Sequence, residues 1–298
     1  MPLKSFNANL SPGIKELTMK IRKDLLTTAM AGELASKLKG RGIEFEDYRD
    51  YSTEDDAARI DWRASQRSQK LLVREYKLDV NFNVFFMIDV SESMLMSSTK
   101  KLKCEYAAEV VNTLFYGLVS SGNSVGFCLF ADGLKKLVKS KLGKKQYHLF
   151  IKEVADPKNY GGNKNMGKAI HQTLSVLDRK TMIFLVSDFI GQAGPLAEYL
   201  KIIAQVHETI GIMISDPLDL RLPSSTGQIL IQDPYSDETI YADVHDYGNL
   251  YQQYSMKQTE LISTTFQKNR SKFLQLTTDQ GFYNPMLKFF RKMGATWR

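Results

Sequence analysis

From residue 83 onward the sequence alternates short apolar runs with longer amphipathic stretches, and this alternation constrains the fold most strongly. The apolar runs have strand length and are rich in β-branched and aromatic residues. Strands that alternate with helices form a mostly parallel α/β sheet with helices on both faces. The expected strands are 83–89, 124–131, 181–187, 209–215 and 272–277, and the expected helices are 101–120, 145–154, 166–177, 194–207, about 247–271 and 286–292.

The chain is divided at about residue 80, because the alternation begins only after that point. Residues 1–80 are expected to form an N-terminal extension that packs on a single α/β domain spanning residues 81–298. Within the extension, apolar residues at helical spacing predict a helix over 11–39, and residues 71–80 read as a strand. Residues 228–244 predict a hairpin inside the larger domain.

The sequence has the features of a cytoplasmic protein. No apolar run reaches the roughly eighteen residues of a membrane helix, and the first residues lack the apolar segment of a signal peptide. The two cysteines, Cys104 and Cys128, both lie in apolar stretches. We expect them to be reduced thiols in the core.

The charge of the chain is moderately basic, with a net value of +7 from 40 basic and 33 acidic residues. Lysines concentrate between residues 135 and 145, a stretch that contains no arginine. This stretch is either a solvated face or a contact for phosphate groups. The second reading makes a nucleic-acid-binding module an alternative function, although few aromatic residues are present for base stacking.

Hydroxyl and carboxylate side chains follow two of the expected strands. Asp89, Ser91 and Ser93 come directly after the first strand, and Asp188 follows the strand 181–187. Ligands of open α/β sheets bind beyond the carboxyl ends of the strands. Because these oxygen donors suit Mg²⁺ or Mn²⁺, the four residues are candidate metal ligands. The alternative is that Asp89 caps the next helix.

This pattern resembles the von Willebrand factor A domain and its metal-ion-dependent adhesion site, over about residues 81–216. The resemblance implies a Rossmann-like sheet in which these four residues hold a divalent cation that a partner's carboxylate completes. The family also supplies a threonine from a glycine-containing loop, but here that loop reads Gly161-Gly162-Asn163-Lys164. Asn163 or Lys164 takes the position of the threonine, depending on the alignment. Asparagine could still ligate a cation, whereas the lysine ammonium would neutralise the aspartates in place of the metal.

The charged N-terminal segment resembles the domain-of-unknown-function family fifty-eight, whose members carry a von Willebrand factor A-like domain. The resemblance spans about residues 41–200. Members commonly accompany MoxR-type AAA+ ATPases, which implies a role as adaptor or co-chaperone. The segment is either a docking surface or a layer of ion pairs around a packed Trp62. Its candidate docking residues are Arg49, Asp55, Asp56, Arg59 and Asp61.

Three classes of function follow from these features. The first is a non-enzymatic interaction module that works with an AAA+ ATPase, and the second is the nucleic-acid-binding module. The third is a metal-dependent hydrolase. An aspartate-nucleophile phosphatase usually places a second carboxylate two residues after the first, where this chain has Ser91. The sequence therefore favours the interaction module.

Overall fold

A six-stranded sheet organises the computed structural model, which describes residues 3, 5–10, 44–52, 60–77, 82–177, 180–223, 227–232 and 239–295. The helix expected over 11–39 lies outside the described residues. The order of the strands in the sheet is β10-β7-β6-β3-β4-β5. The strands are β3 (Asn83–Asp89), β4 (Ser124–Phe130), β5 (Leu134–Lys141), β6 (Met182–Ser187), β7 (Glu208–Ser215) and β10 (Lys272–Thr277).

The central strand β3 pairs in parallel with β4 on one side and with β6 on the other. Strands β7 and β10 continue the parallel arrangement beyond β6, while β5 runs antiparallel to β4 at the opposite edge. The chain therefore reverses its direction of winding between β3 and β6. At such a switch point the loops that follow the two strands diverge, which leaves room for a site between them.

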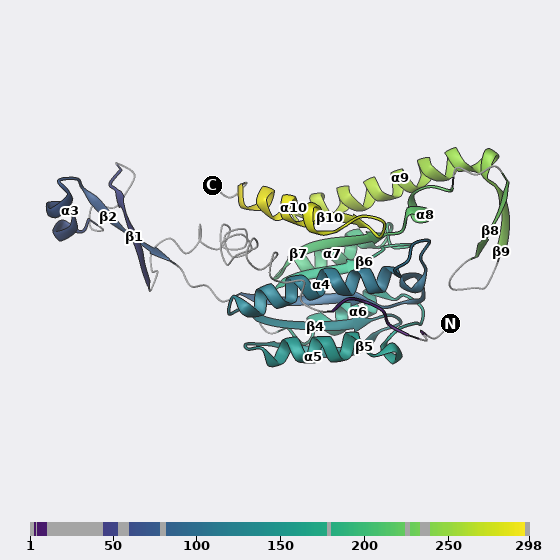
Figure 1. Ribbon diagram of the computed structural model, residues 1–298, viewed down its shortest axis with the longest axis horizontal. Coiled ribbons are helices and arrows are strands. Elements are labelled where there is room, and N and C mark those ends of the chain that lie inside the picture. The colour runs from purple at the N-terminus through teal and green to yellow at the C-terminus, as the bar shows by residue number, and fades with distance from the viewer. Residues whose placement is uncertain are drawn as a thin grey trace.

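Helices cover both faces of the sheet, as Figure 1 shows. Side chains of β3 alternate between two cores: Phe86 and Ile88 enter one, and Phe85 and Met87 enter the other. The first core includes buried residues of α4, α5 and α10, and the second includes residues of α6, α7 and α9. These helices are α4 (Lys103–Ser120), α5 (Lys145–Val154), α6 (Met166–Leu174), α7 (Leu196–Ala204), α9 (Val244–Lys268) and α10 (Tyr283–Ala295).

The expected α/β fold class is confirmed, and each of the five expected strands ends within one residue of its observed bounds. The hairpin is also present as β8 (Gln228–Gln232) and β9 (Thr239–Asp243), although its turn lies outside the described residues. Strand β5 was not among the expected strands, because lysines occupy positions on both of its faces and interrupt the alternation of apolar and polar residues. Most of the lysine-rich stretch is thus an edge strand, where charged side chains prevent pairing with other chains.

A small N-terminal unit lies apart from the sheet in Figure 1. It contains β1 (Glu44–Asp50), the antiparallel β2 (Leu72–Lys77) and α3 (Trp62–Ser68). Asp61 caps α3 by accepting hydrogen bonds from the backbone N–H groups of Arg63 and Ala64. The expectation that Trp62 packs inside this unit is wrong. Trp62 is the first residue of the short helix α3, and its side chain is 66% exposed.

Residues 5–10 lie along α4 and belong to the main body of the protein. The backbone N–H groups of Asn7 and Asn9 donate to the carboxylates of Glu105 and Glu109, at 2.6 and 2.7 Å. The ring of Phe6 contacts that of Tyr160, with 5.3 Å between the centroids. The segment therefore satisfies two carboxylates of α4 while it covers part of the first core.

Both cysteines are buried and free, as the sequence predicts. Burial raises the pKa of each thiol to about 12, which keeps the thiols protonated and unreactive at neutral pH. Among the residues that the structure describes, no helix is long and apolar enough to cross a membrane.

Close packing of α9 on β7 depends on the absence of a side chain at Gly211. A Cβ atom there would overlap the ring of Phe266, which also contacts the rings of Phe189 and Phe273 at 5.5 and 5.3 Å between centroids. We expect Gly211→Ala to lower the free energy of unfolding by about 1–3 kcal/mol through overpacking, measured by urea denaturation. Gly281→Ala is the control, because its added Cβ would meet nothing within 4 Å. Equal stability of the two variants would contradict this account.

Candidate functional site at the carboxyl edge of the sheet

The loop that follows β3 folds back onto the carboxylate of Asp89. Ser91 donates to Asp89 Oδ1 from its backbone N–H at 2.9 Å and from its hydroxyl at 2.6 Å. The hydroxyl of Ser187, at the end of β6, donates to Asp89 Oδ2 at 2.6 Å. The Ser93 hydroxyl lies 3.4 Å from that of Ser91. Asp89, Ser91 and Ser93 are thus brought together as expected, and all three are at most 1% exposed.

A glycine turn carries Lys164 into the same site. Gly161 and Gly162 have φ values of +99° and +97°, a region that residues with a Cβ rarely adopt. The turn is attached to the loop after β3, since Gly161 N–H donates to Val90 O and Glu92 N–H donates to Gly162 O. Asn163 is exposed, whereas the side chain of Lys164 is 3% exposed. The structure therefore brings Lys164, and not Asn163, to the aspartates.

The ammonium of Lys164 bridges Asp89, the last residue of β3, and Asp188, the residue that follows β6. Its Nζ atom lies 3.0 Å from Asp89 Oδ2 and also forms an ion pair and hydrogen bond with Asp188 Oδ1. A cation held by these two carboxylates would need the place that this ammonium takes. The donor set with Lys164 in place therefore does not fit a Mg²⁺ or Mn²⁺ ion, because the ammonium supplies the positive charge and has no lone pair to offer.

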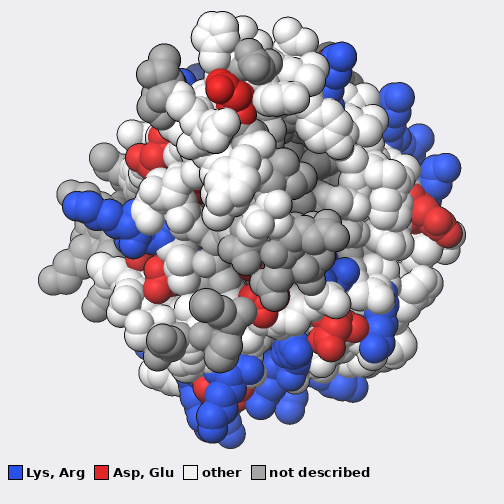
Figure 2. Space-filling view, turned by 90° about the vertical axis from the view of Figure 1, so that its right-hand side faces the viewer, with Lys and Arg blue, Asp and Glu red and all other residues white. Residues whose placement is uncertain are grey.

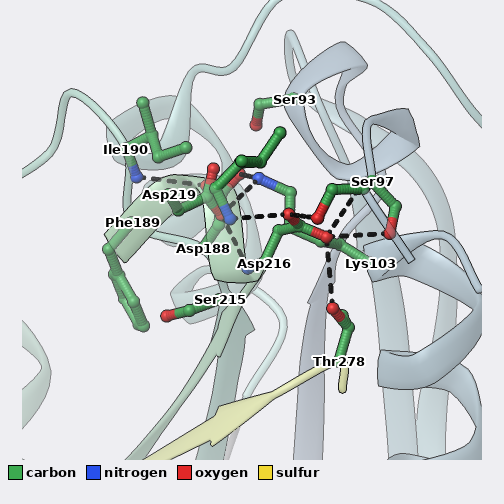
Figure 3. Close-up of polar contacts among 12 residues, drawn as sticks. Ser93, Ser97, Lys103, Asp188, Phe189, Ile190, Ser215, Asp216, Asp219 and Thr278 are labelled. Atoms are coloured by element: carbon green, nitrogen blue, oxygen red, sulfur yellow. Dashed lines mark hydrogen bonds and ion pairs between the residues drawn. The ribbon is translucent and has the colours of Figure 1, made fainter. Parts of the chain in front are cut away.

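A second buried lysine, Lys103, extends the charged cluster. Its Nζ atom lies 2.9 Å from Asp188 Oδ2 and 3.0 Å from Asp219 Oδ2. Lys103 and Asp219 were not among the residues predicted for the site. The position of Lys103 at the start of α4 could have indicated it, because a cation at a helix N-terminus is unfavourable unless a nearby anion compensates for it. Figure 3 shows these side chains converging above the ends of the strands.

Asp216, directly after β7, anchors the neighbouring loops with neutral donors. Its carboxylate accepts hydrogen bonds from the Ser97 hydroxyl, from the backbone and hydroxyl of Ser98, from the Leu218 N–H and from the Thr278 hydroxyl. Figure 3 shows the contacts with Ser97 and Thr278. The backbone N–H of Asp216 donates to Asp219 Oδ2 at 2.8 Å, which joins this loop to the lysine cluster.

The cluster shifts the pKa values of Asp188 and Lys103 so that each favours its charged form. Burial alone would raise the pKa of Asp188, but the ammonium groups of Lys103 and Lys164 outweigh it and hold this pKa well below its usual range. Burial alone would likewise lower the pKa of Lys103, but Asp188 and Asp219 outweigh it and raise this pKa. The charged forms of these residues are therefore the stable ones at neutral pH.

A cavity of about 380 Å³ opens beside the cluster, between the loop after β6 and helix α9. Asp188 and Asp219 lie at its polar side. Its other walls are mainly apolar and aromatic side chains: Phe189, Ile190, Met213, Tyr251, Tyr254 and Ile262. The cavity gives a partner group access to a cluster that is otherwise closed.

Of the candidate docking residues of the N-terminal segment, the structure describes Arg49 and Asp61, which belong to the N-terminal unit. Asp55, Asp56 and Arg59 lie outside the described residues, and Arg49 lies on β1. Asp61 is 7% exposed, caps α3 and accepts a hydrogen bond from the Tyr48 hydroxyl at 3.0 Å. Asp61 therefore has a structural role within the N-terminal unit.

The strand order, the Asp-x-Ser-x-Ser loop after β3 and the second aspartate after β6 form an α/β domain that resembles the von Willebrand factor A type. The chain belongs to the family described as "Protein of unknown function DUF58", which matches residues 47–260.

Mycobacterial proteins and two solved structures are similar to parts of this chain. Uncharacterized proteins of Mycobacterium bovis and Mycobacterium tuberculosis are 26% identical over 223 residues, which is 74% of this chain and 69% of theirs. Among solved structures, the conserved hypothetical protein BatB from Bacteroides thetaiotaomicron has a TM-score of 0.49 at 14% identity, covering 72% of this chain and all of that one. A von Willebrand factor type A protein from Catenulispora acidiphila has a TM-score of 0.41 at 12% identity, covering 76% of this chain and 44% of that one.

Removing the bridging ammonium should destabilise the protein in a pH-dependent way. Lys164→Met leaves buried carboxylates without their partner, and we expect a loss of roughly 3–5 kcal/mol in the free energy of unfolding at pH 7. The low pKa of Asp188 contributes stability that is present at neutral pH and lost as the pH falls below the unfolded value of about 4. The deficit of the variant, measured by chemical denaturation, should therefore stay nearly constant down to about pH 4 and shrink as the pH falls further. Lys168→Met, at an exposed lysine of α6, is the control, and a deficit equal to that of this control would contradict the bridge.

Restoring a threonine tests whether the ammonium stands in for a cation. We expect the melting temperature of the wild-type protein to be the same in Mg²⁺ and in EDTA. In Lys164→Thr the melting temperature should rise with Mg²⁺, since an ion at a hundred times its dissociation constant contributes about 2.7 kcal/mol. A wild-type melting temperature that itself rises with Mg²⁺ would show that a cation displaces Lys164.

Proposed function

We propose that this protein is a non-enzymatic interaction module that binds a partner protein at the carboxyl edge of its sheet without using a metal ion. The observation that carries the proposal is the bridge of Lys164 between Asp89 and Asp188. In the family that the sequence resembles, a divalent cation holds this position and recruits the partner. Here a tethered ammonium keeps the same loops assembled.

The state of the carboxylates supports a binding role over a hydrolytic one. Asp89 and Asp188 are 0% and 1% exposed, and both are paired with ammonium groups. A general base must reach the proton that it removes, and its pKa must lie near the working pH. A buried carboxylate with a strongly lowered pKa, such as Asp188, meets neither condition.

We further propose that the partner is a MoxR-type AAA+ ATPase and that the protein acts as its adaptor. The support for this step is membership of the family, which commonly accompanies such ATPases. Trp62 and Ile190 mark two exposed surfaces on which the partner can be tested. Trp62 is 66% exposed on α3, and Ile190 is 41% exposed beside the cavity.

The position of the lysine-rich stretch accounts for it without nucleic acid. Lys135 forms an ion pair with Asp132 and Lys136 forms one with Glu153, both at 3.1 Å. Both lysines lie on the edge strand β5, where their charge protects the strand from unwanted pairing. The interaction module therefore remains the better supported function.

Capture from native extract tests both the partner and the surface. We expect the wild-type protein, used as bait, to retain an AAA+ ATPase that is identified by mass spectrometry. Ile190→Ser should reduce this capture several-fold, because it removes apolar contact at the carboxyl edge. The control variant Trp62→Ser changes a more exposed apolar side chain on the N-terminal unit and should leave capture unchanged.

The opposite pattern has a definite meaning. Loss of capture with Trp62→Ser alone would move the docking surface to the N-terminal unit and overturn the proposal for the carboxyl edge. Recovery of nucleic acid and its proteins without any ATPase would overturn the proposed partner. Both variants change exposed residues, so circular dichroism should show wild-type folding for each.

A further inference from the structure

We propose that the cavity between the loop after β6 and helix α9 receives a basic side chain, arginine or lysine, from the partner protein. This inference rests on the proposed function and names the chemical group that the site recognises. It reverses the charge of the usual arrangement, in which a partner's carboxylate completes the shell of a bound cation.

The first argument is the charge balance of the cluster. Three carboxylates, those of Asp89, Asp188 and Asp219, share the two ammonium groups of Lys103 and Lys164. The nearby Asp216 adds a fourth carboxylate whose hydrogen-bond donors are all neutral. Counted over the described residues alone, these six side chains carry net negative charge, which would repel an incoming carboxylate.

The second argument is where this excess charge meets solvent. The side chains of Lys103 and Asp188 are 2% and 1% exposed, whereas that of Asp219 is 25% exposed and lines the cavity. Asp219 Oδ2 accepts from Lys103 and from the backbone of Asp216. Its other oxygen, Oδ1, accepts no hydrogen bond from the described residues. Asp219 is thus the member of the cluster that has capacity for a further donor.

The walls of the cavity suit the rest of a long basic side chain. Tyr254 is 62% exposed and lines the cavity with Ile190 and Ile262. Aromatic faces attract a guanidinium or ammonium group, and apolar walls accommodate the methylene stem of arginine or lysine. The hydroxyl of Tyr251 donates to the carbonyl of Leu218 at 2.9 Å, which fixes that ring at the edge of the cavity.

The surface around the site does not oppose a basic partner. Figure 2 faces the side of the molecule on which the β8–β9 hairpin lies, and its Lys and Arg side chains gather mainly towards the lower and right-hand edges. The upper part of this face is mostly uncharged.

A peptide titration tests the charge of the recognised group directly. The probes are blocked pentapeptides, Ala-Ala-X-Ala-Ala, in which X is arginine, lysine, citrulline or glutamate. The readout is the methyl NMR spectrum of the full chain, followed at Ile190, Met213 and Ile262. We expect the arginine and lysine peptides to shift these methyl signals, and the neutral isostere citrulline and glutamate to leave them unchanged.

Two variants connect the response to the cavity. Asp219→Asn should weaken binding of the arginine peptide by roughly tenfold or more, the usual effect of losing a charge-assisted hydrogen bond. Tyr254→Ala should also weaken binding of this peptide, although it leaves the residues of the lysine cluster unchanged. Tyr241→Ala, on the exposed hairpin, is the control and should have no effect. Equal shifts by arginine and citrulline, or stronger shifts by glutamate, would overturn the inference.

The partner experiment separates this inference from the proposed function. An ATPase that loses affinity for Ile190→Ser but not for Asp219→Asn would overturn the inference that a basic side chain enters the cavity. Docking at the carboxyl edge would remain supported. An ATPase that is indifferent to both variants would overturn the proposed surface itself.

Discussion

One buried ammonium group, that of Lys164, holds together the two strands that meet at the centre of the sheet. Strand β3 ends in Asp89 and strand β6 is followed directly by Asp188, and two carboxylates placed side by side in a dry site would repel each other. The lysine removes this conflict because its turn is attached to the loop after β3. The conformations of the Asp-x-Ser-x-Ser loop, of the double-glycine turn and of the end of β6 are consequently linked.

The cluster is better understood as a device for specificity than as a source of net stability. Burying an ion pair costs about as much in desolvation as it returns in attraction, although breaking such a pair is expensive. Each carboxylate here is shared between elements that are distant in sequence: Asp188 joins β6 to α4, and Asp219 joins α4 to the segment after β7. Arrangements that separate these elements leave a charge buried without its partner, so the cluster selects one relative placement of the loops.

The sequence predicted the sheet better than it predicted the site. Apolar runs identify buried strands because burial and β-branching act locally. The polar residues that follow those runs placed Asp89 and Asp188 in one expected site, and both contact Lys164. The choice between Asn163 and Lys164 depended on the backbone of Gly161 and Gly162, which spacing alone does not define. Lys103 and Asp219 escaped notice because their roles arise from contacts 85 and 116 residues away. Strand β5 was missed because its lysines serve the edge of the sheet and obscure the alternation.

The segment at residues 5–10 has a consequence for the order in which the chain assembles. Asn7 and Asn9 bind carboxylates of α4 that lie 98 and 100 residues further along the chain. Contacts between residues so far apart close late, because a large loop must first be ordered. During synthesis residues 5–10 emerge well before α4, so their binding surface forms only later. A segment that is synthesised before its partner helix is therefore among the last to reach its final position, where it covers a body that has already formed.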